Sequence, residues 1–354
     1  MNFDLDENQS LFKAAVERFS ASTDIPARLR TRKLDGGFDR ARWKEMAELG
    51  LIALAASESD GGLGGSSLDC AVVAQALGRG QAVEPWLECG FLPTRLLAGT
   101  PMIESIVSGE TLAAFAFAET GRRFALDAVQ VRARKTVDGY LLSGEKQFVL
   151  GGATADLFAV TANLNGQTVV FIVPRDSKGV AVKAFPVVDG SFAAILMLHD
   201  VAVGSPLQNG SERLEKAIDD GRLMASAEMT GLAQRLFDDT LEYVKTREQF
   251  GQPLGRFQVI QHNMVGGYEK VELMQSALYR ALLAQPSNWA NEMRGLKAFV
   301  GDAAIAVAHL AVQMHGGMGT TDELGIGHGL KRIMLLSKLF GDPASDLATY
   351  AQAA

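Results

Sequence analysis

The spacing of apolar residues changes twice along the chain, and this change limits the possible folds more than any other feature. The first hundred residues have helical spacing, and Asp6 with Gln9 predicts a capping box at the start of the first helix. One face of that helix is expected to be apolar and to consist of Leu11, Phe12, Ala15, Val16 and Phe19. The chain therefore begins with a helical region.

Between about residues 111 and 205 the pattern alternates between apolar and polar positions, as it does in strands. Asp138-Gly139 predicts a hairpin turn, and the segments 157–162 and 168–173 are expected to pair across Asn165-Gly166. A small β domain follows from this pattern.

From Leu214 onward the helical spacing returns in longer runs, and His315-Gly316-Gly317 predicts a glycine cap at the end of the longest one. Wide apolar stripes predict a helical bundle that packs against other subunits as well as itself. We therefore expect an α+β fold with an N-terminal α-helical domain (1–110), a central β domain (111–205) and a C-terminal four-helix bundle (206–354).

Composition excludes several classes of partner. The net charge of −7 over 354 residues argues against nucleic acid and anionic membranes. We expect no membrane-spanning segment, because the most apolar stretch, near Phe299 to Met314, contains Asp302 and His309. An acidic start and only two cysteines, Cys70 and Cys89, predict a cytoplasmic protein without disulfides, and no metal site is expected.

Two segments of the last helical region stand out: Thr246 to Gly251 (TREQFG) followed by Phe257-Gln258, and Gln313 to Gly319 (QMHGGMG). Taken singly, each has an ordinary explanation. Arg247 could be a solvated cation at a helix end, Gln258 a surface amide, and the glycines a cap and turn without a ligand. The combination, in this order and with two long helices between the segments, makes chance an unlikely explanation.

Together these motifs resemble the C-terminal half of the acyl-CoA dehydrogenase family, and the resemblance extends over nearly the whole chain. It implies an acyl-CoA dehydrogenase-like fold, FAD as cofactor and oxidoreductase activity on an acyl-CoA substrate in fatty acid or lipid catabolism. In that family the arginine and the glutamines reach the pyrophosphate and adenosine end of a neighbouring subunit's FAD. The cofactor-binding residues implied here are Arg247, Phe250, Gln258, Gln313, Gly316 and Gly317.

The resemblance is weaker around the flavin ring. Ala118 stands where the family has a threonine, and the serine of the same loop is not evident within Glu119 to Arg123. Phe148 replaces the family's tryptophan and is expected to pack against the flavin, but Leu150, in place of threonine, offers no hydroxyl group. The resemblance thus implies an eroded ring site in this chain.

Asp219 and Arg222 match the family's substrate contacts, although an i to i+3 surface ion pair is an equally good explanation. The catalytic carboxylate of the family is not found in this chain. The two positions at which family members carry it correspond to Phe340 and Gly221 here. A nearby aspartate, such as Asp220 or Asp342, would be displaced by angstroms, which costs orders of magnitude in rate. Asp342 is also expected to cap a helix that begins near Pro343. The catalytic residue is therefore unknown.

Three functional hypotheses follow. In the first, the chain resembles the small subunits of heteromeric bacterial members such as pimeloyl-CoA dehydrogenase, as Leu339 to Asp342 (LFGD) indicates, and completes a FAD site shared with a larger catalytic subunit. In the second, it is a self-sufficient homo-oligomer that uses a displaced aspartate as base. In the third, it is a scaffold that binds neither flavin nor substrate. The family implies an electron-transfer flavoprotein as electron acceptor.

Overall fold

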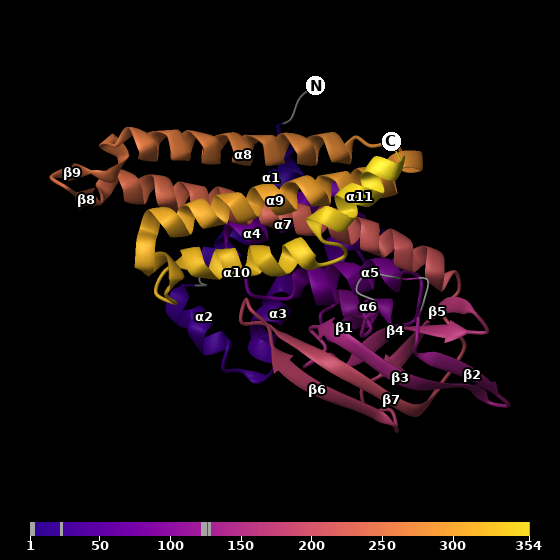
Figure 1. The fold of residues 1–354 in the computed structure, drawn as a ribbon. Helices are drawn as coiled ribbons and strands as arrows, with labels where there is room; N and C mark the ends of the chain where they lie inside the picture. Colours follow the sequence, from indigo (N-terminus) through magenta and orange to yellow (C-terminus); the bar gives the residue numbers. More distant parts are fainter. Residues whose placement is uncertain (1–3, 22–23, 122–125, 127–128, 354) are drawn as a thin grey trace. The chain divides into compact units, whose positions relative to one another are not determined.

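The structure of the protein is a computed structural model that describes residues 4–21, 24–121, 126 and 129–353 (Figure 1). Its strands are β1 (Ala113–Ala116), β2 (Arg132–Thr136), β3 (Gly139–Leu150), β4 (Leu157–Leu164), β5 (Gln167–Pro174), β6 (Val180–Pro186), β7 (Phe192–Val203), β8 (Glu248–Gln249) and β9 (Gln252–Pro253). Its α-helices are α1 (Glu7–Ala21), α2 (Ile25–Thr31), α3 (Arg40–Glu48), α4 (Ser67–Arg79), α5 (Leu92–Leu96), α6 (Ile103–Val107), α7 (Gly210–Thr246), α8 (Gln258–Leu282), α9 (Trp289–His315), α10 (Gly325–Lys338) and α11 (Pro343–Ala353). The order of helices, strands and helices confirms the predicted α+β class.

The chain packs into two compact units. The helical unit comprises Met1–Leu29, Ser67–Ala82 and Arg222–Ala354, and the sheet unit comprises Arg30–Ser66 and Val83–Gly221. The helical unit thus joins N-terminal helices α1 and α4 to the C-terminal helices. The domain boundaries expected after residues 110 and 205 stay a prediction.

Helix α1 begins with the predicted capping box. The backbone N–H of Gln9 donates to Oδ1 of Asp6 at 2.8 Å, and the N–H of Asp6 donates to Oε1 of Gln9 at 3.1 Å. Val16 and Phe19 are buried as expected, but Leu11 is 61% exposed, so its assignment to the buried face is wrong. The physical reason is that Gln9 occupies the buried position and donates to Asp69 of α4 at 2.9 Å.

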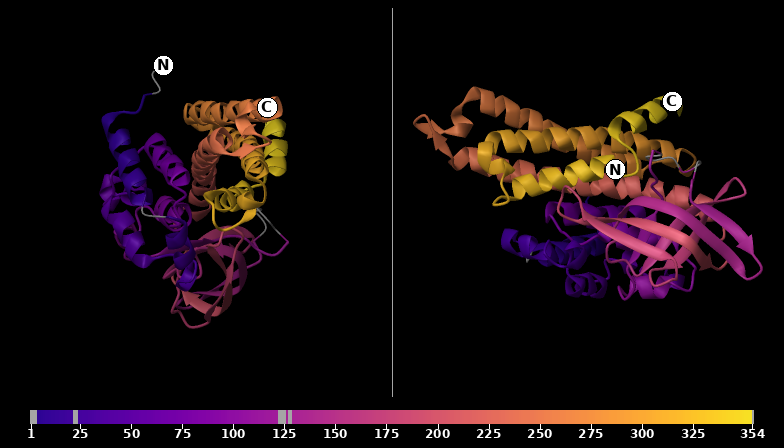
Figure 2. Two further views of the ribbon diagram at one scale, coloured as in Figure 1. Left: turned by 90° about the vertical axis from the view of Figure 1, so that its left-hand side faces the viewer. Right: turned by 60° about the horizontal axis from the view of Figure 1, so that its bottom comes forward.

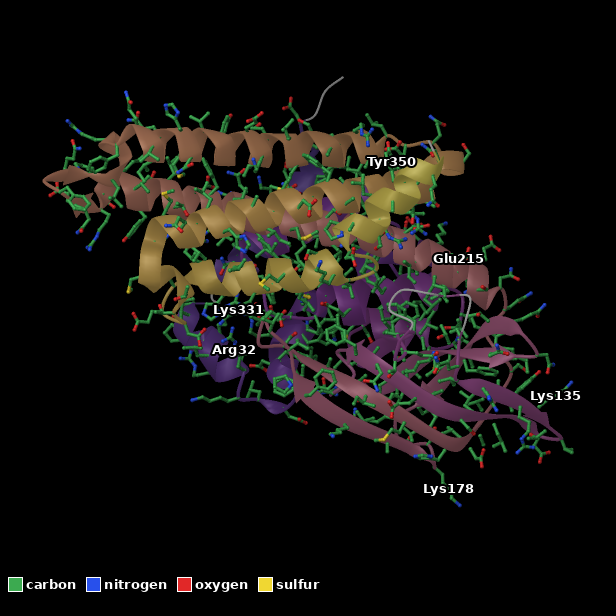
Figure 3. The ribbon with its side chains drawn as sticks, in the orientation of Figure 1. Arg32, Lys135, Lys178, Glu215, Lys331 and Tyr350 are labelled. Atoms are coloured by element: carbon green, nitrogen blue, oxygen red, sulfur yellow. The ribbon has the colours of Figure 1, made fainter. Side chains whose placement is uncertain are left out.

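The sheet unit contains a seven-stranded sheet in the order β1-β4-β2-β3-β7-β6, with β5 paired to β4. The predicted hairpins are confirmed: β2 and β3 pair around Asp138-Gly139, and β4 and β5 pair around Asn165-Gly166, where both φ angles are positive. Its core is apolar and centres on Phe158, Val160, Phe171, Leu196 and Leu198. Lys135 on β2 and Lys178 before β6 point outward into solvent (Figure 3).

In the helical unit, α9 packs against α8, α10 and α11. Its buried face is the predicted stripe, including Leu296, Val300, Val307 and Met314. Gly316 ends the helix with φ +59°, which confirms the predicted glycine cap.

The stretch Pro286–Thr320, which includes α9, is long and apolar enough to cross a membrane by length and composition. The expectation that no apolar run would reach membrane-spanning length is therefore wrong. Asp302 and His309 lie within the stretch, but its mean hydropathy is still high enough. Within it, 56% of the most apolar window is buried in the protein. Packing against three neighbouring helices accounts for its apolar character.

Candidate functional site

The first sequence motif forms a hairpin between α7 and α8. The N–H of Arg247 donates to the carbonyl of Tyr243 at 2.8 Å, which continues the helical pattern, and the N–H of Leu254 donates back to the carbonyl of Arg247 at 2.9 Å. Strands β8 and β9 pair on either side of Phe250 and Gly251, whose φ angles are +56° and +81°. This two-residue turn leaves the Phe250 side chain 92% exposed.

The second motif forms the end of α9 and the turn that follows. Gln313, Gly316 and Gly317 are exposed, and a Cβ atom added at either glycine would meet no atom within 4 Å. The hydroxyl of Thr320 donates to the carbonyl of Gly317 at 2.9 Å and holds the turn. Only Gly316 needs glycine for its backbone angle, so the open space at Gly317 can admit a ligand close to the main chain.

The two motifs lie at the same end of the helical unit. The rings of Tyr243 and His315 stack with centroids 4.2 Å apart, and both the β8–β9 hairpin and the α9–α10 turn lie at this end (Figures 1 and 2). Arg247, Gln258 and Gln313 are exposed, and within the described residues none of their side chains has a hydrogen bond or ion pair. A guanidinium, two amides and open glycine backbone suit the phosphate and ribose groups of FAD.

The expected ring site lies in the sheet unit and offers fewer polar groups. Phe148 is 42% exposed with φ +53°, at a register irregularity between β3 and β7, and its ring lies 6.2 Å from that of Phe185. Leu150 is buried and pairs with Ala193, and Ala118 offers only a carbonyl, which accepts from Gln147. Residues 122–125 of the preceding loop lie outside the described residues. Phe148 can therefore pack on a flavin, but positions 118 and 150 supply no side-chain hydrogen bond.

A buried ion pair behind this region was missed by the sequence reasoning. Nζ of Lys146 lies 2.6 Å from Oε1 of Glu119 and 2.6 Å from the hydroxyl of Thr161. Burial lowers the pKa of Lys146 to about 8, and Glu119 opposes that shift. The Glu119 carboxylate also accepts from the N–H groups of Gln130 and Val131. The available signal was Lys146 itself, which follows Leu142 in the inward register of β3.

The expected position of the catalytic carboxylate is a buried corner between α10 and α11. Phe340 is 2% exposed with φ +62°, an unusual backbone angle for a bulky residue, and Gly341 has φ +143°. Nη2 of Arg222 donates to the carbonyl of Phe340 at 2.7 Å. Nζ of Lys297 donates to the carbonyls of Ser337 and Gly341 at 3.0 and 3.2 Å. Arg222 and Lys297 thus hold three carbonyl groups, one in the last turn of α10 and two in the connection to α11.

Asp346 on α11 supplies the negative charge of this corner. Its Oδ1 lies 3.6 Å from Nε of Arg222 and 3.9 Å from Nη1 of Arg294, and a Cβ added at Gly341 would lie 2.4 Å from it. Burial raises the pKa of Asp346 and lowers the pKa of Lys297 to about 7. The sequence reasoning missed both residues, although Lys297 interrupts the apolar stripe of α9.

The aspartates considered as alternative bases are engaged elsewhere or buried. Oδ1 of Asp342 accepts from the N–H of Ser345 at 2.9 Å, which confirms the predicted helix cap. Oδ2 of Asp220 lies 3.9 Å from Nε of Arg95. Asp219 and Arg222 are only 9% and 5% exposed, so the alternative of a surface ion pair is wrong. Their role as substrate contacts stays a prediction.

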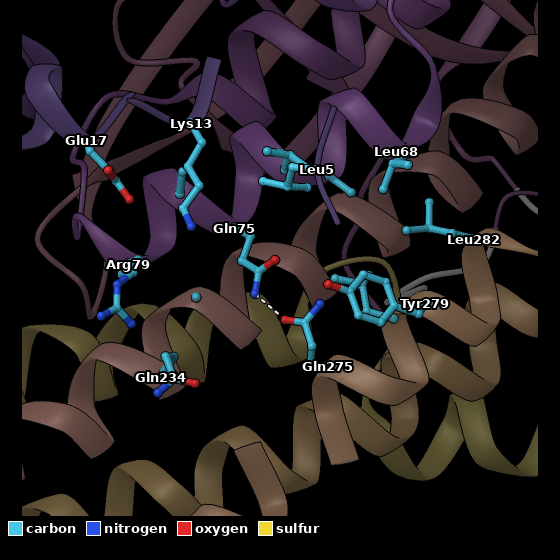
Figure 4. A pocket seen from close by; sticks show the side chains of 15 residues that line it. Leu5, Lys13, Glu17, Leu68, Gln75, Arg79, Gln234, Gln275, Tyr279 and Leu282 are labelled. Carbon is cyan, nitrogen blue, oxygen red and sulfur yellow. Dashed lines mark hydrogen bonds between the residues drawn. The ribbon is translucent and has the colours of Figure 1, made fainter. Parts of the chain in front are cut away.

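The helical unit also contains a cavity of about 480 Å³ between α1, α4, α7 and α8. Gln75 and Gln275, hydrogen bonded at 2.5 Å, lie between a charged side and the leucines Leu68 and Leu282 (Figure 4). The charged side chains labelled there are Lys13, Glu17 and Arg79. A second cavity of about 540 Å³ shares Glu17 and Arg79 with it. Among the described residues, no predicted site residue lines either cavity.

Comparison with known proteins identifies the family. Three family models match in sequence order: the acyl-CoA dehydrogenase N-terminal domain (6–100), middle domain (114–195) and C-terminal domain (208–353). Acyl-CoA dehydrogenase FadE27 of Mycobacterium tuberculosis is 30% identical and covers 86% of this chain and 84% of its own. The probable acyl-CoA dehydrogenase YngJ of Bacillus subtilis is 27% identical, with 98% and 97% covered.

A crystal structure of the ChsE4-ChsE5 complex from Mycobacterium tuberculosis contains a chain with a TM-score of 0.89 and 26% identity, covering 99% of this chain and 98% of that one. The expected order of an N-terminal helical, a middle β and a C-terminal helical domain is thereby confirmed. This chain belongs to the acyl-CoA dehydrogenase family, FAD-dependent oxidoreductases that act on the CH–CH groups of acyl-CoA substrates.

Proposed function

We propose that this chain is the non-catalytic or weakly catalytic subunit of a heteromeric acyl-CoA dehydrogenase of the small-subunit type. In this arrangement it completes a FAD site whose isoalloxazine ring lies in a larger catalytic subunit. The observation that carries the proposal is the contrast between Arg247, which is exposed and uncommitted among the described residues, and Phe340, which is buried where the family has its base.

The binding residues support a contribution to a partner's cofactor. Arg247 would hold pyrophosphate oxygens in a charged fork, and Gln258 and Gln313 would hydrogen bond ribose or phosphate. Gly316 and Gly317 would admit the cofactor close to the backbone, and the exposed ring of Phe250 would cover apolar surface beside it. All six positions are exposed in the isolated chain, as a surface that meets another subunit requires.

The residues at this chain's own catalytic position and flavin-ring site also support a non-catalytic role beside a catalytic partner. Bound FAD supplies the acceptor for a hydride from the β-carbon, and the protein must supply a base for the α-proton. Phe340 cannot accept a proton, and Asp342 caps α11. Phe148 retains an aromatic surface for a flavin, but Leu150 supplies no hydroxyl. Asp219 and Arg222 remain our candidates for contact with an acyl-CoA.

The similarity to a chain of the ChsE4-ChsE5 complex, named as an assembly of two different proteins, is consistent with a heteromer. We further propose an electron-transfer flavoprotein as electron acceptor and the cytoplasm as the location. Cys70 and Cys89 are both buried and not disulfide bonded, as in proteins of reducing compartments.

The decisive measurement is flavin absorbance per chain, for the protein alone and after co-expression with an acyl-CoA dehydrogenase encoded beside it. We expect a colourless lone protein and a complex with about one flavin for every two chains, because only the partner supplies a complete ring site. A lone protein with nearly one flavin per chain and with turnover would instead support a self-sufficient homo-oligomer that uses a displaced aspartate.

Replacing Arg247 tests the shared site itself. In the complex, Arg247→Ala should release FAD, because a charge-assisted contact to phosphate is lost. Arg235→Ala on α7 is the matched control, since Arg235 is exposed and, among the described residues, forms its ion pair with Asp239 one helical turn away. Equal FAD content in both variants would contradict the proposal and favour a scaffold without a cofactor role.

A further inference from the structure

A stacked pair of rings joins the two helix ends that carry the predicted FAD contacts. Tyr243 lies in the last turn of α7 and His315 is the last residue of α9, and their ring planes are 24° apart with centroids separated by 4.2 Å. The two residues are 72 positions apart, so only the tertiary fold brings them together. Tyr243 lies outside both sequence motifs, and His315 lies in the second motif without an assigned role.

The backbone connects each ring-bearing residue to a predicted FAD contact, through a hydrogen bond from Arg247 to Tyr243 and through the peptide bond from His315 to Gly316. The carbonyl of Tyr243 accepts from the N–H of Arg247 at 2.8 Å, so the start of the hairpin is fixed to the residue that carries the ring. His315 immediately precedes Gly316, whose N–H donates to the carbonyl of Gln313. A change in the separation of the rings would therefore move Arg247 relative to the Gly316-Gly317 backbone.

The His315 ring is held in one orientation. It is 7% exposed, and its Nδ1 lies 2.8 Å from the carbonyl of Ala311, which can only accept, so Nδ1 carries a proton. The turn after α9 folds back onto the same residue, because a Cβ at Gly319 would lie 3.2 Å from Cβ of His315. His315 thus connects the helix, the turn and the Tyr243 ring.

The hairpin itself packs on the start of α8, where the ring centroids of Phe250 and Phe257 lie 6.3 Å apart. Glu248, Gln249, Phe250 and Gly251 are all exposed. Its closing bond, from Leu254 to Arg247, is internal to the connection and does not reach α9. The position of Arg247 relative to the end of α9 therefore depends on how the last turn of α7 packs, and the Tyr243–His315 stack is part of that packing.

We propose that Tyr243 and His315 are positioning residues of the shared FAD site. Their stack sets the separation between the Arg247 guanidinium and the Gly316-Gly317 backbone, so that both engage the same pyrophosphate-containing half of FAD. This inference rests on the proposed function. It assigns neither residue a contact with the cofactor, because each acts through its neighbour.

The test uses the complex with its co-expressed partner, stripped of flavin and titrated with FAD while flavin fluorescence and the thermal midpoint are followed. Tyr243→Leu and His315→Leu remove a ring, and we expect each to weaken FAD binding about tenfold, the upper range for an aromatic pair. Tyr243→Phe and His315→Phe retain flat rings and should restore binding to within about twofold of the natural chain. If the residues only filled space, the leucine variants would lower the thermal midpoint without weakening FAD binding.

Combining substitutions separates positioning from packing. If Tyr243 acts through Arg247, Tyr243→Leu should have almost no further effect on FAD affinity in an Arg247→Ala background. Fully additive effects, or full FAD affinity in both leucine variants, would overturn the positioning role while the proposed function stands. If Arg247→Ala itself leaves FAD affinity unchanged, the proposed function fails first, and the inference fails with it.

Discussion

Two regions of the helical unit use their charged groups in opposite ways. At the end of α7 and α9, Arg247 and Gln313 are exposed and, among the described residues, make no side-chain hydrogen bond. At the corner between α10 and α11, Arg222, Lys297 and Asp346 are buried, and they form an ion pair or hydrogen bonds to backbone carbonyls. The first region is suited to bind something outside the chain, whereas Lys297 and Asp346 in the second hold the chain itself.

This difference explains how a chain can retain a family's fold and lose its base. The catalytic position was replaced by a bulky apolar side chain, yet the backbone of the corner is held by three polar contacts that do not involve that side chain. Stability and catalysis are therefore separable at Phe340. The Arg247 side chain makes no hydrogen bond or ion pair with the described residues, so its charge is available to a ligand or partner.

The largest effect is expected where a buried charge loses its partner. Asp346→Ala would leave Arg222, Lys297 and Arg294 without their neutralising carboxylate, and we expect a loss of about 3–5 kcal/mol in the free energy of unfolding. Urea unfolding measures this loss. Asp239→Ala is the control, because its exposed pair with Arg235 contributes about 0.3–0.5 kcal/mol. If both variants lost the same free energy of unfolding, Asp346 would not be stabilising the buried cations of this corner.

Substitutions at two glycines test how tightly the two regions are packed. Gly341→Ala would place a Cβ 2.4 Å from Asp346 at φ +143°, and we expect a loss of about 2–4 kcal/mol from overpacking and backbone strain together. Gly317→Ala meets open space at an ordinary backbone angle and should change stability by less than about 0.5 kcal/mol. Thermal unfolding of both variants decides the matter, and a Gly341→Ala variant as stable as Gly317→Ala would refute the close packing.

The pH dependence of stability tests the buried lysine. Lys297 ordinarily loses its proton near pH 10.5, but in the folded chain its pKa is about 7. Between these values the unfolded chain binds more protons, so stability should rise with pH, by up to about 1.4 kcal/mol per pH unit, and this contribution should be constant below pH 7. Lys297→Met should reduce the rise and leave the part that comes from Lys146, whose pKa is lowered to about 8, whereas Lys216→Met, at an exposed site, should not change it. Identical slopes would contradict the low pKa.

Local features of the fold were predictable from the sequence. The Asp6–Gln9 capping box, the Asn165-Gly166 hairpin turn and the Asp342 cap each depend on residues within four positions of one another. Their physics is contained in a short segment, so a short pattern is enough to identify them. Leu11 was assigned to the wrong face because burial also depends on the neighbouring helix, here through the Gln9–Asp69 bond.

The polar contacts of the site were less predictable. Arg222 meets Phe340 across 118 positions, and Lys297 meets Gly341 across 44. Nothing in a period of 3.6 or 2 residues indicates which carbonyl a buried cation will reach. What the pattern did contain was an anomaly, a lysine in an apolar stripe at Lys297 and another in an inward strand register at Lys146. Such anomalies indicate a buried polar cluster without identifying its partners.

The smallest effects should separate binding from stability most cleanly. Gln258→Ala and Gln313→Ala each remove a neutral amide that is exposed in the free chain, so unfolding should be unchanged, while FAD affinity in the complex should fall by about 0.5–1.5 kcal/mol per hydrogen bond. Gln285→Ala, an exposed amide beyond the opposite end of α8, is the matched control and should alter neither quantity. FAD titration and thermal unfolding of the three variants measure both. One outcome would contradict the contrast between the two regions: Gln258→Ala or Gln313→Ala lowers stability without changing FAD affinity. That glutamine would then stabilise the fold, as Lys297 and Asp346 do, and would not be a binding group.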